Sequence, residues 1–469
     1  MKFLFALFIL PFGFVAGAET PGRFARQAPM PAVDFSTWWK AFGDAPLNRL
    51  VEAALAGNPS LLVAEARVRE ARQKRLAAAG DWWPQVRGSG GIMRDQQSGG
   101  SRFGGFAGFA APQTMYDAGL DASWEIDVFG RIRYSVKAAA ADAQAAEEAR
   151  RDVLISLLAE VAANYVDLRG LQQQLIVLED NIASQQKTVE LTKSRVKAGL
   201  SPELVVAQAE TLLANSRAAA PSVEAAIAEA MHRLATLTGK PPGALIAELS
   251  SPKAIPVGAA TVPAGLPSEL LLRRPDVRRA EREFAAAKAR VGAARAERLP
   301  RFTISTQAGF ESAETGTLIE EKSKEWSVGP RVSIPLFTGG KLKANQRAAE
   351  AGRDQAQAAW DQAVLTALED VESALVVYRK SQERLTALND AEKASSRALQ
   401  LAQDLYKNGL GDFLNVLEAQ RSVLAAQEQV VGARRSVSLN LVKLYKALGG
   451  GWESATTVPR PVDSASRSR

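Results

Sequence analysis

A seven-residue repeat of apolar side chains runs through the chain between positions 130 and 198. An apolar residue at every seventh position keeps one stripe on the same side of a helix that packs in the left-handed coiled-coil manner. At a rise of ~1.5 Å per residue, a helix over this range would extend roughly 100 Å. The pattern therefore predicts one very long helix, unlike those of ordinary globular domains. The repeat positions are Leu154, Val161, Leu168, Leu175, Ile182, Val189 and Val196.

The chain repeats this pattern about 210 positions later, which indicates an internal duplication. Asn58-Pro59 and Arg274-Pro275, each of which opens a helical run, are 216 positions apart. A duplication of this size predicts an architecture built by pseudo-symmetry, with function located where the two copies meet. The second stripe is interrupted only by Glu392 and consists of Val364, Val371, Tyr378, Leu385, Glu392, Leu399 and Tyr406.

Two-residue alternation predicts strands ahead of each long helix, because successive side chains of a strand point to opposite faces. A half-buried strand of a soluble sandwich also alternates in this way. An acidic face opposite an apolar face with a tryptophan near one end is more typical of a membrane barrel. The alternating apolar positions are Leu120, Ala122, Trp124, Ile126 and Val128, then Phe302, Ile304, Thr306, Ala308 and Phe310, then Trp326, Val328, Val332, Ile334 and Leu336.

Each copy is expected to be a strand hairpin joined to a long antiparallel helix pair. The first copy, 58–239, has strands at about 84–94 and 113–129 and helices at about 59–79, 130–198 and 203–238. The second, 274–449, has strands at about 300–311 and 325–337 and helices at about 275–298, 341–408 and 411–448. A proline-rich linker, 240–273, separates the copies. An irregular segment with short helices, 19–57, precedes them, and a disordered tail, 450–469, follows.

The first 18 residues are typical of a secretory signal peptide. Lys2 is followed by an apolar run, and Ala16-Gly17-Ala18 supplies a small-x-small cleavage site. The chain has no cysteine, so disulfides, thiolate metal sites and lipidation of an N-terminal cysteine are excluded. The formal net charge of +7 is spread along the chain without a concentrated basic face, which speaks against nucleic-acid binding.

Four strands per chain are too few to close a membrane barrel. Open sheet edges are not tolerated in lipid, and the smallest membrane barrels use about eight strands. Either the chain forms oligomers or its strands lie outside a membrane. Three chains would supply twelve strands and twelve helices in cross-section.

Three segments together resemble the TolC-like outer-membrane factor family, the channel subunits of drug-efflux systems. The first is Asp127-Val128-Phe129-Gly130-Arg131 and the second is Leu336-Phe337-Thr338-Gly339-Gly340. The third is Gly409-Leu410-Gly411-Asp412-Phe413-Leu414-Asn415-Val416-Leu417-Glu418-Ala419-Gln420-Arg421-Ser422. With the duplication, the resemblance covers nearly the whole mature chain.

The resemblance implies a mainly α fold with a membrane β-barrel. A homotrimer would form a 12-stranded β-barrel and a 12-helix periplasmic α-barrel in the outer membrane of a Gram-negative bacterium, in contact with its lipid. The implied partners are a periplasmic adaptor (membrane fusion) protein and an inner-membrane efflux pump of the resistance-nodulation-division type. The implied function is an exit channel for drugs and other small molecules.

The resemblance also implies a periplasmic gate. In the family, apolar and acidic side chains with a nearby arginine close the periplasmic end, and these roles fall to Leu414, Glu418 and Arg421. Spacings of i, i+4 and i+7 place the three on one helix face. Three copies would form rings that restrict passage by size and charge. Family members often carry aspartate at the position of Glu418. An ordinary surface pair between Glu418 and Arg421 is the alternative interpretation.

Two further sets of residues follow from the resemblance. The turns Gly199-Leu200 and Gly409-Leu410 would be the adaptor-contacting tips, although glycine there also suits a helix C-cap. The acidic strand residues Asp121, Glu125 and Asp127 would line the barrel lumen and favour cations.

The sequence offers no catalytic pattern, and we expect neither an enzyme nor a cofactor or metal. His232 is the only histidine, and neither Gly339-Gly340-Lys341 nor Gly239-Lys240 has the spacing of a phosphate-binding loop. Two alternative functions remain. One is the outer-membrane channel of a type I protein secretion system, and the other is a periplasmic coiled-coil scaffold or adaptor.

Overall fold

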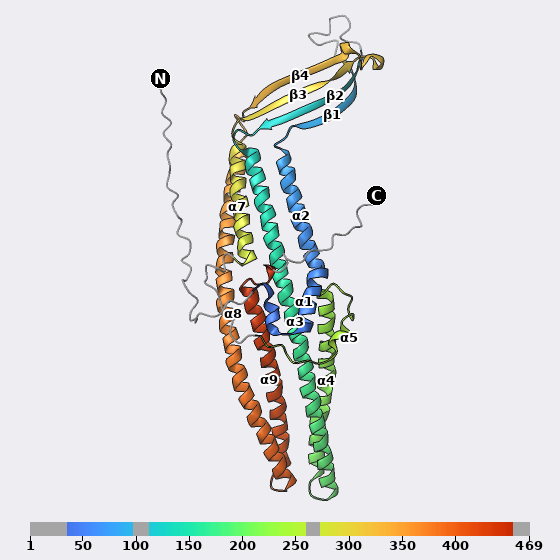
Figure 1. Ribbon diagram of the computed structural model, residues 1–469, viewed down its shortest axis with the longest axis vertical. Coiled ribbons are helices and arrows are strands. Elements are labelled where there is room, and N and C mark those ends of the chain that lie inside the picture. The colour runs from blue at the N-terminus through green and yellow to red at the C-terminus, as the bar shows by residue number, and fades with distance from the viewer. Residues whose placement is uncertain (1–34, 97–111, 259–272, 454–469) are drawn as a thin grey trace, which may run out of the picture. The chain divides into compact units, whose positions relative to one another are not determined.

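The computed structural model describes residues 35–96, 112–258 and 273–453 (Figure 1). The expected signal peptide and most of the expected tail lie outside these ranges. The chain divides into two compact units. Unit 1 comprises Met1–Asn58, Ile155–Arg274 and Thr366–Arg469, and unit 2 comprises Pro59–Leu154 and Pro275–Leu365. The long helices α3 (Arg131–Lys197) and α8 (Lys341–Lys407) each contribute residues to both units.

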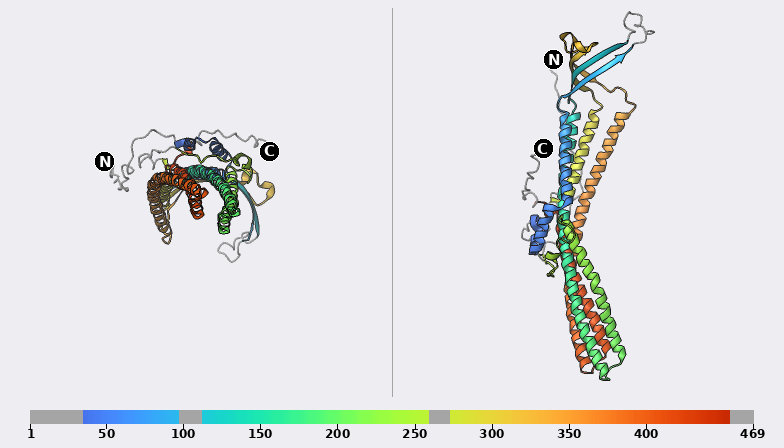
Figure 2. Two further views of the ribbon diagram at one scale, coloured as in Figure 1. Left: turned by 90° about the horizontal axis from the view of Figure 1, so that it is seen from below. Right: turned by 90° about the vertical axis from the view of Figure 1, so that its right-hand side faces the viewer.

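A four-stranded antiparallel sheet forms one end of unit 2 (Figure 2). Its order is β1-β2-β3-β4, so that each copy supplies a hairpin and β2 pairs with β3 to join the copies. Within the described residues no helix is both long enough and apolar enough to cross a membrane. The strands are β1 (Gln85–Asp95), β2 (Gln113–Ile126), β3 (Arg301–Ser312) and β4 (Lys324–Ser333).

Two strands end earlier than the sequence pattern predicts. The strand expected to reach 129 stops at Ile126, because the carboxylate of Asp127 binds the backbone at the start of α3. The strand expected to reach 337 stops at Ser333, so that Ile334 and Leu336 lie beyond it. Pro335, which has no backbone N–H to donate to a strand partner, follows this end directly.

The strand register gathers apolar side chains on one face of the sheet. Leu120 lies opposite Ala308, which lies opposite Trp326, and Trp124 lies opposite Ile304. Alternation then places the remaining members on the same face. Charged side chains of the described strands occur on this face only at Arg94 and Lys324, near the hairpin ends that do not join the helices. The face consists chiefly of Val86, Ile92, Ala118, Leu120, Ala122, Trp124, Ile126, Phe302, Ile304, Ala308, Phe310, Trp326, Val328 and Val332.

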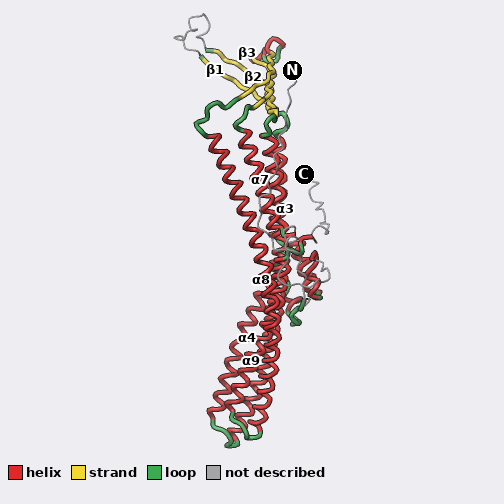
Figure 3. Tube along the Cα trace, turned by 90° about the vertical axis from the view of Figure 1, so that its left-hand side faces the viewer, coloured by secondary structure: helices red, strands yellow, loops and turns green. Residues whose placement is uncertain are grey.

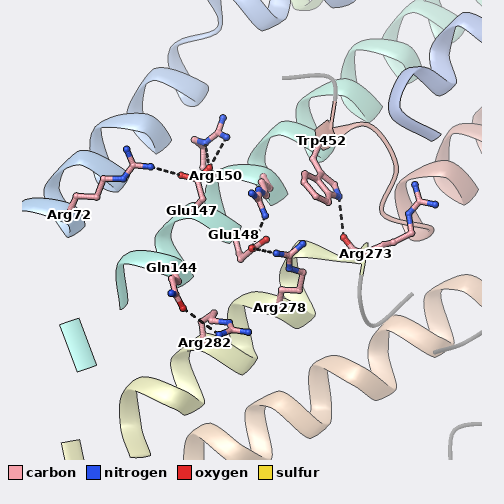
Figure 4. A network of polar contacts seen from close by, with 10 residues as sticks. Arg72, Gln144, Glu147, Glu148, Arg150, Arg273, Arg278, Arg282 and Trp452 are labelled. Carbon is pink, nitrogen blue, oxygen red and sulfur yellow. Dashed lines mark hydrogen bonds and ion pairs between the residues drawn. The ribbon is translucent and has the colours of Figure 1, made fainter. Parts of the chain in front are cut away.

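Ion pairs connect the helices of unit 2 (Figure 4). Glu147 of α3 binds Arg72 of α2 (Pro59–Gly80) at 3.5 Å, and Arg150 reinforces it at 2.8 Å. The neighbouring Glu148 binds Arg278 of α7 (Pro275–Ala296) at 2.8 Å. The helices α2 and α7 occupy equivalent places in the two copies. Adjacent carboxylates of α3 therefore bind both.

Unit 1 contains the second part of each long helix and its partner, α4 (Glu203–Leu237) or α9 (Phe413–Ala447). Three members of the heptad stripe of α3 are buried here, with Val161 and Leu168 fully inaccessible to solvent and Val189 3% exposed. The long helices end in the turns that connect them to α4 and α9 (Figure 3). The short helices η1 (Phe35–Phe42) and α1 (Ala45–Gly57) complete this unit.

The described part of the inter-copy linker is bound firmly to unit 1. It contains the short helix α5 (Ile246–Leu249). Buried Arg169 of α3 donates to the carbonyl of Ser251 at 2.9 Å, and Ser438 of α9 donates to that of Pro256 at 2.7 Å. Side chains from both copies therefore hold this segment.

The expected tail begins later than 450. The Trp452 indole N–H donates to the carbonyl of Arg273 at 3.1 Å, and Gly451 packs against Leu158 and Trp38. Residues 450–453 therefore belong to the fold, and 454–469 lie outside the described ranges.

Candidate functional site

The three expected gate residues share the exposed face of α9. The helix begins at Phe413, two residues later than expected, and the Asp412 carboxylate accepts from the Leu414 backbone N–H at 3.5 Å. Leu414 is 56% exposed, and Glu418 and Arg421 are exposed as well. The opposite face of the helix is buried.

Glu418 and Arg421 do not form the i,i+3 pair that their spacing allows. In the described ranges neither side chain takes part in an ion pair or a side-chain hydrogen bond. Both charged groups are thus available to other molecules.

An apolar cluster, here called the tip core, fixes the buried face of α9. The rings of Tyr406 and Phe413 lie 5.4 Å apart across the turn between α8 and α9. Buried Gln420 donates to the hydroxyl of Thr188 on α3 at 2.8 Å. Because this face is held, the exposed face has a defined orientation. The tip core consists of Val189, Ala209, Leu212, Leu213, Tyr406, Phe413, Val416 and Leu417.

The two expected tips have the same backbone conformation. Gly199 and Gly409 have φ values of 68° and 72°, which favour glycine. The N–H groups of Leu200 and Leu410 donate back to carbonyls of the preceding helix, each at 2.9 Å, as in a Schellman C-cap. Both leucine side chains are exposed. The turns present apolar side chains to solvent in addition to capping their helices.

One contact at the tips was not predicted from the sequence. Arg195 of α3 donates to the carbonyl of Tyr406 at 3.1 Å, and its guanidinium lies 4.6 Å from the centre of the Tyr406 ring. A cation near the last carbonyls of a helix is favourable because the helix dipole is negative there. The arginine lies in the last turn of one long helix but binds the end of the other. Spacing along one helix carries no signal for such a contact.

The three expected lumen residues have different surroundings. Asp121 accepts a 3.4 Å hydrogen bond from Ser89. Glu125 binds Arg131 through two hydrogen bonds of 2.8 and 2.9 Å. Asp127 lies beyond β2 and accepts from backbone N–H groups at the start of α3. They do not form a uniform acidic patch, because Arg131 compensates the charge of Glu125.

A polar hollow of about 300 Å³ lies beside these residues. Arg87, Asp121 and Glu125 line it, and Arg87 stands directly opposite Asp121 in the strand register. The hollow thus carries both signs of charge. Among the described residues, no group of three His, Asp or Glu side chains is arranged to hold a metal ion.

Exposed aromatic side chains lie where the sheet joins the helices. Trp83 is 74% exposed and Phe337 is 92% exposed. The Trp124 indole N–H donates to the carbonyl of Trp82 at 2.9 Å. Aromatic residues with one polar atom are typical of a membrane–water interface. This boundary of the apolar face resembles the aromatic girdle of membrane proteins.

Comparisons with known proteins agree with this arrangement. The family described as "Outer membrane efflux protein" matches residues 50–240 and 266–450. Nodulation protein T of Rhizobium leguminosarum bv. viciae is 30% identical over 452 residues, covering 95% of this chain and 90% of that protein. The solvent efflux pump outer membrane protein SrpC of Pseudomonas putida is 34% identical over 452 residues, covering 94% and 92%.

Two solved channels resemble the fold closely. The outer-membrane channel OprN has a TM-score of 0.84 and 38% identity, covering 94% of this chain and 96% of OprN. The MtrE outer membrane channel of Neisseria gonorrhoeae, solved in its open state, has a TM-score of 0.80 and 29% identity, covering 94% and 97%. The TolC-like fold expected from the sequence is confirmed. The chain belongs to the outer membrane efflux protein family and is an efflux channel of the outer membrane.

Proposed function

We propose that three copies of this chain form one exit channel for small molecules. The observation that carries the proposal is the open four-stranded sheet with one apolar face. Its outer strands β1 and β4 have no partner on their outer edges among the described strands. Lipid does not tolerate unpaired strand edges, so β1 of one copy pairs with β4 of the next. Three copies then give twelve strands, with the long helices forming a twelve-helix tube.

The proposed partners are a periplasmic adaptor and an inner-membrane pump of the resistance-nodulation-division type. The exposed Leu200 and Leu410 at the tips support an adaptor contact. The proposed cargo is a small organic molecule. SrpC is named for solvent efflux, and OpmQ of Pseudomonas aeruginosa for pyoverdine export. These names favour small molecules over the proteins that a type I secretion channel exports.

We infer that Leu414, Glu418 and Arg421 form the gate in the trimer. Their common exposed face supports this assignment, as does the absence of an ion pair to Glu418 or Arg421 within the described ranges. Three copies around an axis would place a leucine ring beside a ring of carboxylates and guanidinium groups. Asp121 and Glu125 are proposed to line the lumen, with Arg131 reducing the acidic character of the wall.

The test is extraction and conductance of the full chain. We expect the protein to leave outer membranes only with detergent, to migrate as a trimer in native mass spectrometry, and to form channels in planar bilayers. A water-soluble monomer without channel activity would contradict the proposal and favour the periplasmic scaffold. To test the cargo, a strain lacking the chain should become more sensitive to organic solvents and regain tolerance on complementation. Unchanged tolerance together with loss of a secreted protein would favour type I secretion.

A further inference from the structure

Four helices meet the sheet at the same end of unit 2 (Figure 1). The helices α2 and α7 end there, and α3 and α8 begin there. Ion pairs connect them near this end. Arg290 of α7 binds Asp142 of α3 at 2.5 Å, and Arg295 of α7 binds Glu350 of α8 at 3.0 Å. The four helix ends therefore lie side by side next to the sheet, within one compact unit.

This end of the helices is strongly basic. The fifteen residues of each helix that lie nearest the sheet hold sixteen basic and five acidic side chains in total. The rest of the chain holds 42 basic and 46 acidic side chains. The fold thus concentrates at one place a positive charge that is dispersed along the sequence. The four segments are 66–80, 131–145, 282–296 and 341–355.

The two copies share a basic pattern at the start of their long helices. The first, third and seventh residues of α3 and of α8 are basic, and each exchanges arginine for lysine or lysine for arginine between the copies. The four positions between them have no identical residue in the two copies. Positive charge is therefore what this stretch retains. The corresponding residues are Arg131 and Lys341, Arg133 and Lys343, and Lys137 and Arg347.

Six basic side chains near the sheet, here called the basic belt, are exposed and uncompensated. Within the part of the chain that the structure describes, none of them takes part in an ion pair or a side-chain hydrogen bond. Arg131 is not a member, because Glu125 binds it. Its counterpart Lys341 has no such carboxylate, since Pro335 stands at the position of Glu125 in the second copy. The belt consists of Arg75, Arg133, Lys137, Lys341, Lys343 and Arg347.

Helix stability does not account for the belt residues of α3 and α8. Neither helix has an acidic residue in its first turn. Positive side chains at this position oppose the helix dipole, whose N-terminal end is itself positive. The belt residues there therefore weaken their own helices, and a negatively charged partner would offset this effect.

The belt residues of α3 point away from the polar hollow of the sheet. Arg131 and its partner Glu125 line that hollow. With 3.6 residues per turn, Arg133 lies about 200° and Lys137 about 240° around the helix from Arg131. Glu125 alternates with Trp124 and so belongs to the face of the sheet opposite the apolar one. The belt residues of α3 are thus directed away from the polar face.

The belt lies next to the aromatic boundary of the apolar face. Trp83 follows the end of α2 by three residues, and Phe337 precedes the start of α8 by four. The order along unit 2 is apolar strands, then exposed aromatic side chains, then exposed basic side chains. In membrane proteins, aromatic residues lie at the level of the headgroups, and long basic side chains extend to the charged groups beyond the apolar region. The order in unit 2 matches one lipid leaflet from acyl chains to phosphates.

We propose that the basic belt binds the phosphate groups of anionic phospholipids in the leaflet on the helical side of the outer membrane. Ammonium and guanidinium groups donate to the phosphate oxygens, and the acyl chains lie against the apolar face of the sheet. The start of α8 has three basic residues and no acidic residue before Glu350. A headgroup of net negative charge therefore fits better than a zwitterionic one. The inference rests on the proposed function in placing the apolar face in lipid.

The first test is native mass spectrometry of the full chain after mixing with phosphatidylglycerol and phosphatidylcholine of identical acyl chains. We expect wild type to retain phosphatidylglycerol in preference to phosphatidylcholine. Replacing two belt residues on each long helix by glutamine should lower this preference at least about tenfold. An unchanged preference would overturn the inference. The variant is Arg133→Gln, Lys137→Gln, Lys343→Gln, Arg347→Gln.

The matched control neutralises two exposed basic side chains of each long helix at its other end. In the described ranges none of the four has an ion pair or a side-chain hydrogen bond. The control loses the same charge and should keep the lipid preference of wild type. An equal loss in the control would indicate non-specific electrostatics and overturn the inference. The control is Lys187→Gln, Lys197→Gln, Arg397→Gln, Lys407→Gln.

The second test locates the lipid. Phosphatidylglycerol with a photoreactive headgroup is incorporated into nanodiscs that contain the full chain, and cross-linked peptides are identified by mass spectrometry. We expect cross-links within 131–145 and 341–355, and cross-links confined to other segments would overturn the inference. Inorganic phosphate at constant ionic strength should not displace the lipid, because the acyl chains contribute to binding. Displacement by phosphate would identify a small-anion site instead and overturn the inference as well.

A position of the belt in the channel lumen gives a different result. Side chains in the lumen would act on the permeating ions, whereas side chains bound to lipid headgroups would not. We therefore expect equal reversal potentials in asymmetric KCl for wild type and the four-residue belt variant. A shift toward cation selectivity together with an unchanged lipid preference would place the belt in the lumen and overturn the inference.

The failures of the two proposals are distinguishable. If wild type forms trimeric channels without preferring phosphatidylglycerol, the proposed function stands and the inference fails. If the chain is a water-soluble monomer without channel activity, both fail. The fold of each variant is checked by its trimer content and unfolding temperature. Should the belt variant form no trimer, the pair Lys343→Gln, Arg347→Gln replaces it, with an expected loss of preference of about threefold and the same contrary outcome.

Discussion

The side-chain amide of Asn58 donates a 2.8 Å hydrogen bond to the carbonyl oxygen of Leu237. Arg274, the counterpart of Asn58 in the second copy, donates in the same way to the carbonyl of Ala447 at 3.1 Å. Leu237 and Ala447 are the last residues of α4 and α9. In each copy, the residue before the first helix therefore caps the last helix. The copies achieve the same contact with different side chains.

Removing this contact should destabilise the fold. Asn58→Ala leaves the Leu237 carbonyl without its side-chain donor, at a cost of about 1–3 kcal/mol. We expect a lower midpoint of denaturant-induced unfolding in detergent. The control is Arg49→Ala, which breaks a solvent-exposed pair with Glu248 and should cost less than about 1 kcal/mol. An equal decrease of the unfolding midpoint in Asn58→Ala and Arg49→Ala would contradict the assignment of Asn58 as a buried cap.

The close approach of β2 and β3 should tolerate no side chain at Gly309. A Cβ there would lie 2.7 Å from the Ala118 carbonyl oxygen and 2.8 Å from the Gly119 Cα. Because these are backbone atoms of the paired strand, Gly309→Ala must shift the strands. We expect a reduced yield of folded trimer on unheated gels. Gly329→Ala in β4, where a Cβ meets nothing within 4 Å, should fold normally.

The gate assignment predicts a change in conductance. Combining Glu418→Ala with Arg421→Ala should raise single-channel conductance in planar bilayers, because both charged side chains leave the proposed constriction. The control is the double variant Glu428→Ala, Arg434→Ala, because these two residues lie about three turns further along α9. Conductance that does not change in the gate variant would place the constriction elsewhere.

The pairing of Glu125 with Arg131 predicts a change in ion selectivity. Arg131→Gln leaves the Glu125 carboxylate uncompensated at the proposed lumen wall. The cation-to-anion permeability ratio, taken from reversal potentials in asymmetric KCl, should rise by about twofold. The control is Arg133→Gln, since the Arg133 side chain has no described ion-pair partner. Equal shifts in both variants would show that Glu125 is not specifically compensated.

Tyr165 should make the fold sensitive to alkaline pH. Burial raises the pKa of Tyr165 from 10.0 to about 12, and the hydroxyl donates to Asp44 at 2.8 Å. The phenol ionises at lower pH in the unfolded chain, so its stabilising contribution is complete below pH 10 and is lost as pH rises toward 12. Tyr165→Phe should therefore flatten the fall in unfolding temperature between these values. Tyr134→Phe, which removes an exposed tyrosine, should leave the fall unchanged.

Much of the fold could be predicted because its elements are periodic in sequence. The structure places α3 at Arg131–Lys197 and α8 at Lys341–Lys407, within a residue of the expected ranges. Strand ends were predicted less well, since Asp127 and Pro335 act locally to stop pairing. The packed linker and residues 450–453 were not foreseen, because contacts with α3, α9 and Arg273 hold them.

The candidate site could likewise be predicted only in part. One helix face for Leu414, Glu418 and Arg421 followed from spacing alone, since the three lie within two turns of α9. Spacing did not show whether the charges of Glu418 and Arg421 are paired within the chain. The same holds for Glu125, whose neutralisation depends on where the chain turns back toward Arg131.

The duplication, the two periods and the positions of the elements follow from the order of residues, because they are properties of neighbours along one chain. Which charged side chains find a partner depends on the packing of helices that lie far apart in the chain. Arg195 lies over the ring of Tyr406 and donates to its carbonyl, although 211 positions separate the two residues. Charge interactions depend on distance in space, and helix packing alone sets that distance.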